Sequence, residues 1–141
     1  MAGASREEVY DVPAEKFYAA LIDYVSYPEI LGEVDDIKVL DFSETSARIQ
    51  YTINIVKSFS YILKMTQKRP ESLTWQLESG SLFKVNAGSW KVTSQGPNSC
   101  KVAYSLDVEL KVFAPKAITN KLVAVNLPRM MKSFYEKAKL L

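Results

Sequence analysis

The middle of the chain, from about residue 36 to residue 111, alternates apolar and polar side chains along most of its length. In residues 47–55 five apolar side chains alternate with four polar ones, and residues 59–66, 73–78 and 100–111 continue this pattern. Such alternation predicts β-strands with one buried face. Because only a few residues separate the strands, we expect antiparallel hairpins within one sheet.

Three segments beside these strands are less regular. Residues 7–12 predict a short first strand, whereas the acidic residues Glu33, Asp35 and Asp36 predict an exposed loop. The strand predicted over residues 83–93 changes phase around Gly88. A glycine inside a strand indicates either a β-bulge or a close approach of another part of the chain.

Helical periodicity flanks the predicted sheet on both sides. Apolar residues from Phe17 to Tyr24 recur at i, i+3, i+4 and i+7 and predict a helix, and Pro28 separates it from a second short helix over residues 29–31. Residues 116–141 predict one long amphipathic helix, in which Pro128 should produce a kink over residues 124–128. The apolar face of this last helix is expected to consist of Val123, Leu127, Met130, Phe134, Ala138 and Leu141.

Together these elements predict an α+β fold. We expect a curved antiparallel sheet of about seven strands, wrapped around the long C-terminal helix, with two short helices after the first strand. The length of 141 residues suits a single domain over residues 1–141. A curved sheet covered by one helix tends to enclose a hydrophobic pocket, so the capture of an apolar small molecule is the first functional hypothesis.

The composition removes several classes of function. Histidine is absent and cysteine occurs once, at Cys100, which excludes His-dependent catalytic triads and zinc sites built from His or Cys. The five glycines form no phosphate-binding loop. We therefore expect no metal and no cofactor. The lone cysteine, together with the lack of a signal peptide or a long apolar run, predicts a cytoplasmic protein.

Two segments resemble a known family. In residues 23–29 (DYVSYPE) three residues separate an Asp from a Tyr-Pro pair. Residues 87–90 (AGSW) lie in a late predicted strand, before the long C-terminal helix. In these features the chain resembles the START-like superfamily, also called SRPBCC or the Bet v 1-like helix-grip fold, and within it the polyketide cyclase and coenzyme Q-binding group. The resemblance implies a helix-grip fold and a hydrophobic ligand such as a lipid, quinone or polyketide. Residues 30–33 (ILGE) depart from many coenzyme Q-binding relatives, which have an aromatic residue and a second proline there.

If the fold is of this kind, the wall of the pocket follows from the strand and helix patterns. The residues expected to bind the ligand are Tyr51, Ile53, Tyr61, Leu63, Trp75, Trp90, Tyr104 and Leu106 from the sheet, with Val123, Asn126, Leu127, Met130 and Phe134 from the last helix. Ile49 and Met65 share the same faces of their strands and are further candidates for the wall.

Three functions remain open on the sequence alone. The first is a carrier or sensor of a hydrophobic molecule. The second is a cyclase or dehydratase, but it lacks an obvious catalyst, because tyrosine is a poor base at neutral pH and strand parity turns Lys91 and Asp107 toward solvent.

The third function is an interaction module. Residues 116–141 contain six basic residues and one acidic residue. A helix with this excess of positive charge could bind a membrane surface, a ribosome or another protein. A solvated helix face is the simpler interpretation of the same charges. We expect a monomer or weak dimer that does not bind DNA.

Overall fold

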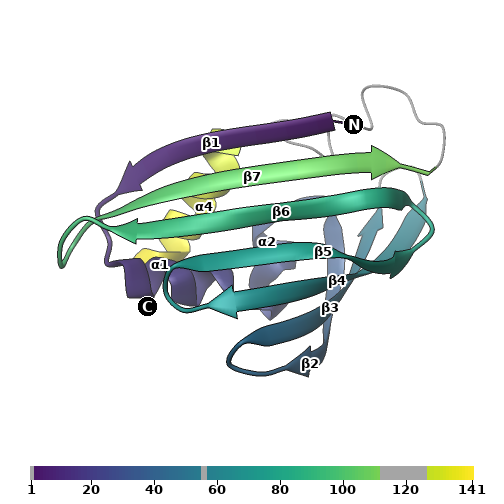
Figure 1. Cartoon of the computed structure of the whole chain (residues 1–141), viewed down its shortest axis with the longest axis horizontal. Helices are drawn as coiled ribbons and strands as arrows, with labels where there is room; N and C mark the ends of the chain where they lie inside the picture. The colour runs from purple at the N-terminus through teal and green to yellow at the C-terminus, as the bar shows by residue number, and fades with distance from the viewer. Residues whose placement is uncertain (1, 55–56, 112–126) are drawn as a thin grey trace.

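The computed structural model describes residues 2–54, 57–111 and 127–141. Seven strands form one sheet in the order β1-β7-β6-β5-β4-β3-β2, and every neighbouring pair is antiparallel (Figure 1). The strands are β1 (Ala2–Tyr10), β2 (Val34–Phe42), β3 (Ser46–Asn54), β4 (Ser58–Lys68), β5 (Ser72–Gly80), β6 (Phe83–Ser94) and β7 (Cys100–Leu110).

The helices lie on one face of this sheet. Helix α1 (Ala14–Leu21), a 3-10 turn η1 (Tyr24–Ser26) and helix α2 (Tyr27–Ile30) follow β1, and α4 (Leu127–Lys139) closes the chain. Figure 1 shows α4 behind the strands, where it packs against α1. The curved antiparallel sheet with a covering C-terminal helix confirms the predicted helix-grip fold.

Apolar alternation along the strands produces the core, as predicted. In β3 the side chains of Ala47, Ile49, Tyr51 and Ile53 are buried, and their polar neighbours are not. In β7 the same alternation runs from Cys100 to Val108. Because successive side chains of a strand point to opposite faces, these residues share the concave face of the sheet beneath the helices.

The irregular phase of β6 at Gly88 comes from a close approach, and not from a bulge. The pairing of β6 with β7 runs without a shift from Val85 to Ser94. A β-carbon on Gly88 would lie 2.5 Å from the backbone oxygen of Ser105 and 2.8 Å from Cε2 of Trp75. The glycine is therefore needed because the Trp75 indole lies directly over the backbone of β6.

Three predictions at or next to the edges of the sheet were wrong. Strand β1 begins at Ala2 rather than at residue 7, since its backbone pairs with β7 along its whole length. Asp35 and Asp36 lie in strand β2 and not in a loop, although both are exposed as expected. Glu33, predicted to be exposed, is half-buried.

The last helix buries a face that differs in part from the predicted one. Leu127, Met131, Phe134 and Ala138 are its buried residues, whereas Leu141 is 50% exposed. The spacing of 4, 3 and 4 residues places Met131 on the core side and turns Met130 partly away from it. The predicted helix N-terminal to Leu127, and most of the predicted kink, lie outside the described residues.

The short second helix begins earlier than predicted. Helix α2 starts at Tyr27, and Pro28 lies in its first turn, where a missing backbone N–H costs no helical hydrogen bond. Across the described ranges, none of the helices has the length and apolar character needed to cross a membrane.

Candidate ligand-binding site

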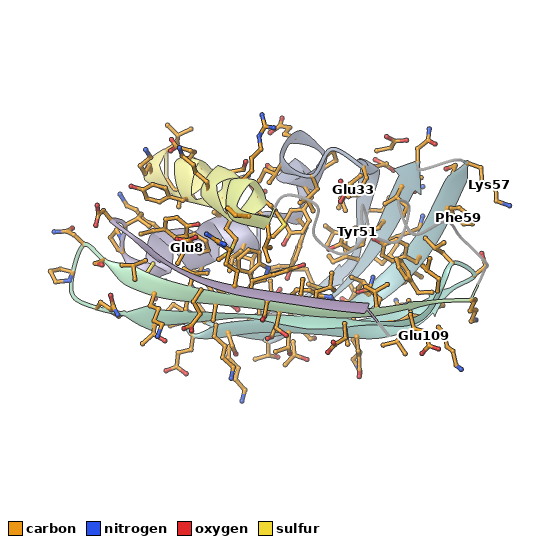
Figure 2. All side chains as sticks on the ribbon, turned by 90° about the horizontal axis from the view of Figure 1, so that it is seen from above. Glu8, Glu33, Tyr51, Lys57, Phe59 and Glu109 are labelled. Carbon is orange, nitrogen blue, oxygen red and sulfur yellow. The ribbon has the colours of Figure 1, made fainter. Side chains whose placement is uncertain are left out.

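A cavity of about 580 Å³ lies between the concave face of the sheet and helix α4. Its volume falls in the range of about 300–1,000 Å³ that is typical of small-molecule sites. Strands β3 to β7 form its floor, and α2, the segment that leads into β2, and the first turns of α4 form its rim. Figure 2 shows Tyr51 and Glu33 on the same side of the sheet as α4.

Most of the predicted wall residues meet around this one cavity. Val123 and Asn126 lie outside the described residues. Ile49 is fully buried beneath its neighbours and does not line the cavity, whereas Met65 does. The predicted residues that line it are Tyr51, Ile53, Tyr61, Leu63, Trp75, Trp90, Tyr104, Leu106, Leu127, Met130 and Phe134.

Cross-strand pairing positions the aromatic residues of the wall. Tyr51 of β3 lies directly opposite Tyr61 of β4, and their rings stack with centroids 5.1 Å apart. Trp90 of β6 lies opposite Tyr104 of β7, with centroids 4.6 Å apart. Phe134 of α4 contacts Trp90 from above, with centroids 5.3 Å apart, and so joins the helix to the sheet at one end of the cavity.

Three tyrosine hydroxyls in this wall have no hydrogen-bond partner among the described residues. These are the hydroxyls of Tyr51, Tyr61 and Tyr104, whereas that of Tyr27 donates to the backbone oxygen of Leu21. Within the described residues, no fully enclosed side-chain nitrogen or oxygen lacks a partner. The three hydroxyls therefore reach the open space of the cavity and are free to bond water or a ligand.

These hydroxyls are protonated at neutral pH, as an ordinary tyrosine is, and burial moves their pKa further from neutrality. The loss of solvent raises the pKa of Tyr51, Tyr61 and Tyr104 above the ordinary value of 10.0. The negative charge of Glu33 raises the pKa of Tyr61 and Tyr104 further. A protonated phenol both donates and accepts hydrogen bonds, so the wall offers neutral polar contacts.

Besides Tyr27, sequence reasoning missed five polar residues of the lining. Asn54, Asn86, Glu33, Arg129 and Ser133 all border the cavity. Asn86 has the same strand parity as Trp90, and a polar residue on an apolar face was the signal that could have identified it. Glu33 was assigned to an exposed loop, although its backbone oxygen accepts a hydrogen bond from the N–H of Asn54.

Candidate catalytic groups outside the cavity can be set aside. Lys91 and Asp107 are exposed on the outer face of the sheet, as strand parity predicted. In the described part of the chain, no three acidic or cysteine side chains come together in a way that could hold a metal ion. Among the described residues that line the cavity, Glu33 is the one carboxylate.

Solved structures share this fold at low sequence identity. The Zhui aromatase/cyclase from Streptomyces sp. R1128 aligns with a TM-score of 0.79 at 11% identity, over 98% of this chain and 93% of that one. A START superfamily protein from Mycobacterium smegmatis gives 0.78 at 19% identity, over 98% and 97%. Human STARD10 gives 0.74 at 20% identity, over 97% of this chain and 63% of that one.

The sequence itself identifies the family. No curated protein sequence matches the chain. The family described as polyketide cyclase / dehydrase and lipid transport matches residues 10–135, which is most of the chain. The protein therefore belongs to the polyketide cyclase/dehydrase and lipid transport family, and the handling of a hydrophobic small molecule is the function that this family assigns to it.

Proposed function

We propose that this protein binds a hydrophobic small molecule in the cavity between the sheet and α4, and that it carries or senses this molecule without transforming it. The proposal rests on the residue composition of the cavity wall. Its floor is mainly aromatic and aliphatic, and the hydroxyls of Tyr51, Tyr61 and Tyr104 have no hydrogen-bond partner among the described residues. Apolar burial supplies affinity, and a few polar groups fix the orientation of the ligand.

The protonation of the wall favours a carrier over an enzyme. A general base must be deprotonated near the working pH, and burial moves the tyrosines of the wall away from that state. These phenols can hold a carbonyl or hydroxyl group in place. They cannot remove a proton from it at neutral pH.

A cyclase or dehydratase remains the second candidate because of Glu33. This carboxylate borders the cavity and lies close enough to Tyr61 and Tyr104 to raise the pKa of both. A carboxylate beside two protonated phenols could act as a base next to two hydrogen-bond donors. Exchange of Glu33→Gln separates the two functions, since a carrier keeps its ligand unchanged whereas an enzyme loses turnover.

We extend the proposal to the cellular location, the oligomeric state and the ligand class of the protein. We place the protein in the cytoplasm, as a monomer or weak dimer, with a lipid, quinone or polyketide as its ligand. Contact of the C-terminal helix with a membrane surface or ribosome is a weaker alternative. Lys137 and Lys139 of this helix already pair with Asp23 and Glu136 within the chain.

The test uses the dye Nile red, whose emission rises in apolar surroundings. We expect the wild type to bind it, and Leu106→Trp, which adds bulk inside the cavity, to weaken binding ~10-fold, or ~1.4 kcal/mol. The matched control is Leu40→Trp, because Leu40 is 42% exposed on strand β2. Equal weakening by both substitutions, or no binding by the wild type, would contradict the proposal.

Organic extraction of the purified protein followed by mass spectrometry then separates carrier from enzyme. A carrier should release one intact apolar molecule per chain, and the same molecule should come from the Glu33→Gln variant. Accumulation of a different, unreacted compound in Glu33→Gln would instead favour the enzyme.

A further inference from the structure

The described core contains two buried polar side chains, Gln67 and Asn86, and their amides differ in one respect. The amide of Gln67 is satisfied on both sides. Its oxygen accepts from the hydroxyl of Tyr24, and its nitrogen donates to the backbone oxygens of Ser43 and Glu44. The amide of Asn86 has a partner on its oxygen only, the indole nitrogen of Trp75 at 3.2 Å.

The contact with Trp75 fixes which way the Asn86 amide faces. An indole N–H can donate but cannot accept, so the atom of Asn86 beside it must be the oxygen Oδ1. The opposite orientation would place two donors against each other. The amide nitrogen Nδ2 of Asn86 therefore faces away from Trp75, with both of its protons available.

The glycine of strand β6 holds this arrangement in place. Trp75 of β5 lies opposite Gly88, and the ring occupies the space that a β-carbon on Gly88 would fill. Its indole nitrogen thereby reaches Asn86, two residues before Gly88 on the same face of the strand. Tyr104 of β7, on the other side of β6, packs beside the indole with ring centroids 6.0 Å apart.

The free nitrogen opens into the cavity. Asn86 is 6% exposed and lines the cavity. Among the described residues Nδ2 has no acceptor, and no fully enclosed polar side-chain atom there lacks a partner. The nitrogen must therefore border open space, and the cavity is the open space that Asn86 lines.

We propose that Asn86 is a specificity-determining residue whose Nδ2 donates a hydrogen bond to an acceptor oxygen of the ligand. This inference rests on the proposed binding function and names the ligand class more narrowly, as a hydrophobic molecule with a carbonyl or similar acceptor beside Trp75. A tyrosine hydroxyl can rotate to donate or accept, so it tolerates either group. The amide of Asn86 is held in one orientation and presents donors alone.

The experiment compares fluorene with its ketone fluorenone, in which a carbonyl replaces the methylene of the same three-ring frame. Displacement of bound Nile red measures the affinity of each. In an apolar cavity without a donor, the hydrocarbon should bind at least as tightly as the ketone. With the Asn86 donor, we expect the wild type to prefer the ketone by about five- to tenfold, the usual effect of one hydrogen bond.

Two variants remove the donor in different ways. Asn86→Leu removes the whole amide. Asn86→Asp, measured at mildly alkaline pH, keeps an oxygen for Trp75 but offers no N–H. The tyrosine hydroxyls of the wall can still donate to the ketone in both variants, so we expect the ketone preference to fall about five- to tenfold relative to the wild type rather than to a fixed ratio. Circular dichroism shows whether each variant remains folded. If Asn86→Leu fails to fold, Asn86→Asp still decides the question.

The outcomes separate this inference from the function on which it rests. A ketone preference in the wild type that falls by this factor in the variants supports the role of Asn86. A preference that is the same in the variants as in the wild type, or is absent from the wild type while both compounds bind, overturns that role and leaves the binding function intact. Failure of both compounds and of Nile red to bind the wild type overturns the two proposals together.

Discussion

Gly88 is the residue at which the backbone of the sheet and the wall of the cavity meet. A β-carbon there would clash with the Trp75 ring and would lie 2.5 Å from the backbone oxygen of Ser105. Backbone cannot yield as a flexible side chain does, so any larger residue must move a strand or displace the indole.

We expect Gly88→Ala to lower the free energy of unfolding by about 1–3 kcal/mol, the range for overpacking a tight site. The matched control is Gly32→Ala, because a β-carbon on Gly32 meets no atom within 4 Å. Its effect should stay within about 0.5 kcal/mol. Urea unfolding of both variants measures the difference. If Gly88→Ala and Gly32→Ala had equal free energies of unfolding, Gly88 would not be in close contact with the Trp75 ring and the Ser105 backbone.

The buried tyrosines predict a loss of stability in alkali. Because burial raises the pKa of Tyr61 and Tyr104 above 10.0, the folded protein keeps these protons at pH values where the unfolded chain has lost them. Their contribution is therefore complete below about pH 10 and is lost as the pH rises through the folded pKa values.

Urea unfolding at about pH 8.5 and about pH 11 tests this effect. We expect the wild type to lose more stability between these two conditions than the double variant Tyr61→Phe, Tyr104→Phe, which has no phenols to ionise at those positions. Lysine ion pairs also weaken in alkali, but they are the same in both proteins. If both proteins lost the same stability between the two pH values, Tyr61 and Tyr104 would not have raised pKa values in the folded protein.

At the scale of elements, an ion pair joins helix α4 to the segment after α1. Asp23 forms a salt bridge with Lys137, whose side chain is only 17% exposed, and it accepts a hydrogen bond from Ser26. The hydrogen bond from Lys137 lowers the pKa of Asp23. The stabilisation is thus present above the ordinary carboxyl pKa and is lost as the pH falls through the depressed value.

We expect Asp23→Asn to cost about 0.5–1 kcal/mol near neutral pH, at the upper end for a partly exposed pair. The control is Glu136→Gln, which breaks the more exposed pair with Lys139 and should cost less than about 0.5 kcal/mol. Unfolding at low and high salt measures both substitutions. If Asp23→Asn were as mild as the control, the pair would not help to dock α4.

How far the sequence predicts these elements depends on the strength of each pattern. The alternation in residues 47–53 and 100–108 is unambiguous, and it placed β3 and β7 correctly. Strand β2 was harder to identify because it is an edge strand whose acidic residues face solvent. The phase of β6 could not be read either, since Gly88 contributes no side chain.

At the scale of the whole molecule, the cavity is too large to remain closed and dry. At ~24 cal/mol per Å³, an empty apolar space of 580 Å³ would cost ~14 kcal/mol. The total stability of a domain is only ~5–15 kcal/mol. A closed and empty cavity is therefore excluded, and an apolar ligand that fills the space should stabilise the fold.

The candidate site could be predicted from the sequence only where it follows strand and helix periodicity. Most of the aromatic and aliphatic lining residues were found in this way, but Tyr27, Ile30, Leu31, Val34 and Phe83 were not. Glu33 and Arg129 were not found either, because their position depends on how the start of β2 and α4 curve around one space. No local pattern encodes that curvature, and these two residues are the charged ones of the described lining.

The two indole groups of the chain report directly on whether a ligand enters the cavity. The chain has two tryptophans, Trp75 and Trp90, and both line the cavity. A nitrogen–proton correlation NMR spectrum of labelled protein therefore contains two indole N–H signals that report on the wall alone. Titration with fluorenone should shift both signals and leave the amides of the outward-facing residues Lys91 and Asp107 nearly unchanged. If the indole signals stayed fixed at saturation, or the shifts lay on the outer face of the sheet, the cavity would not be the binding site.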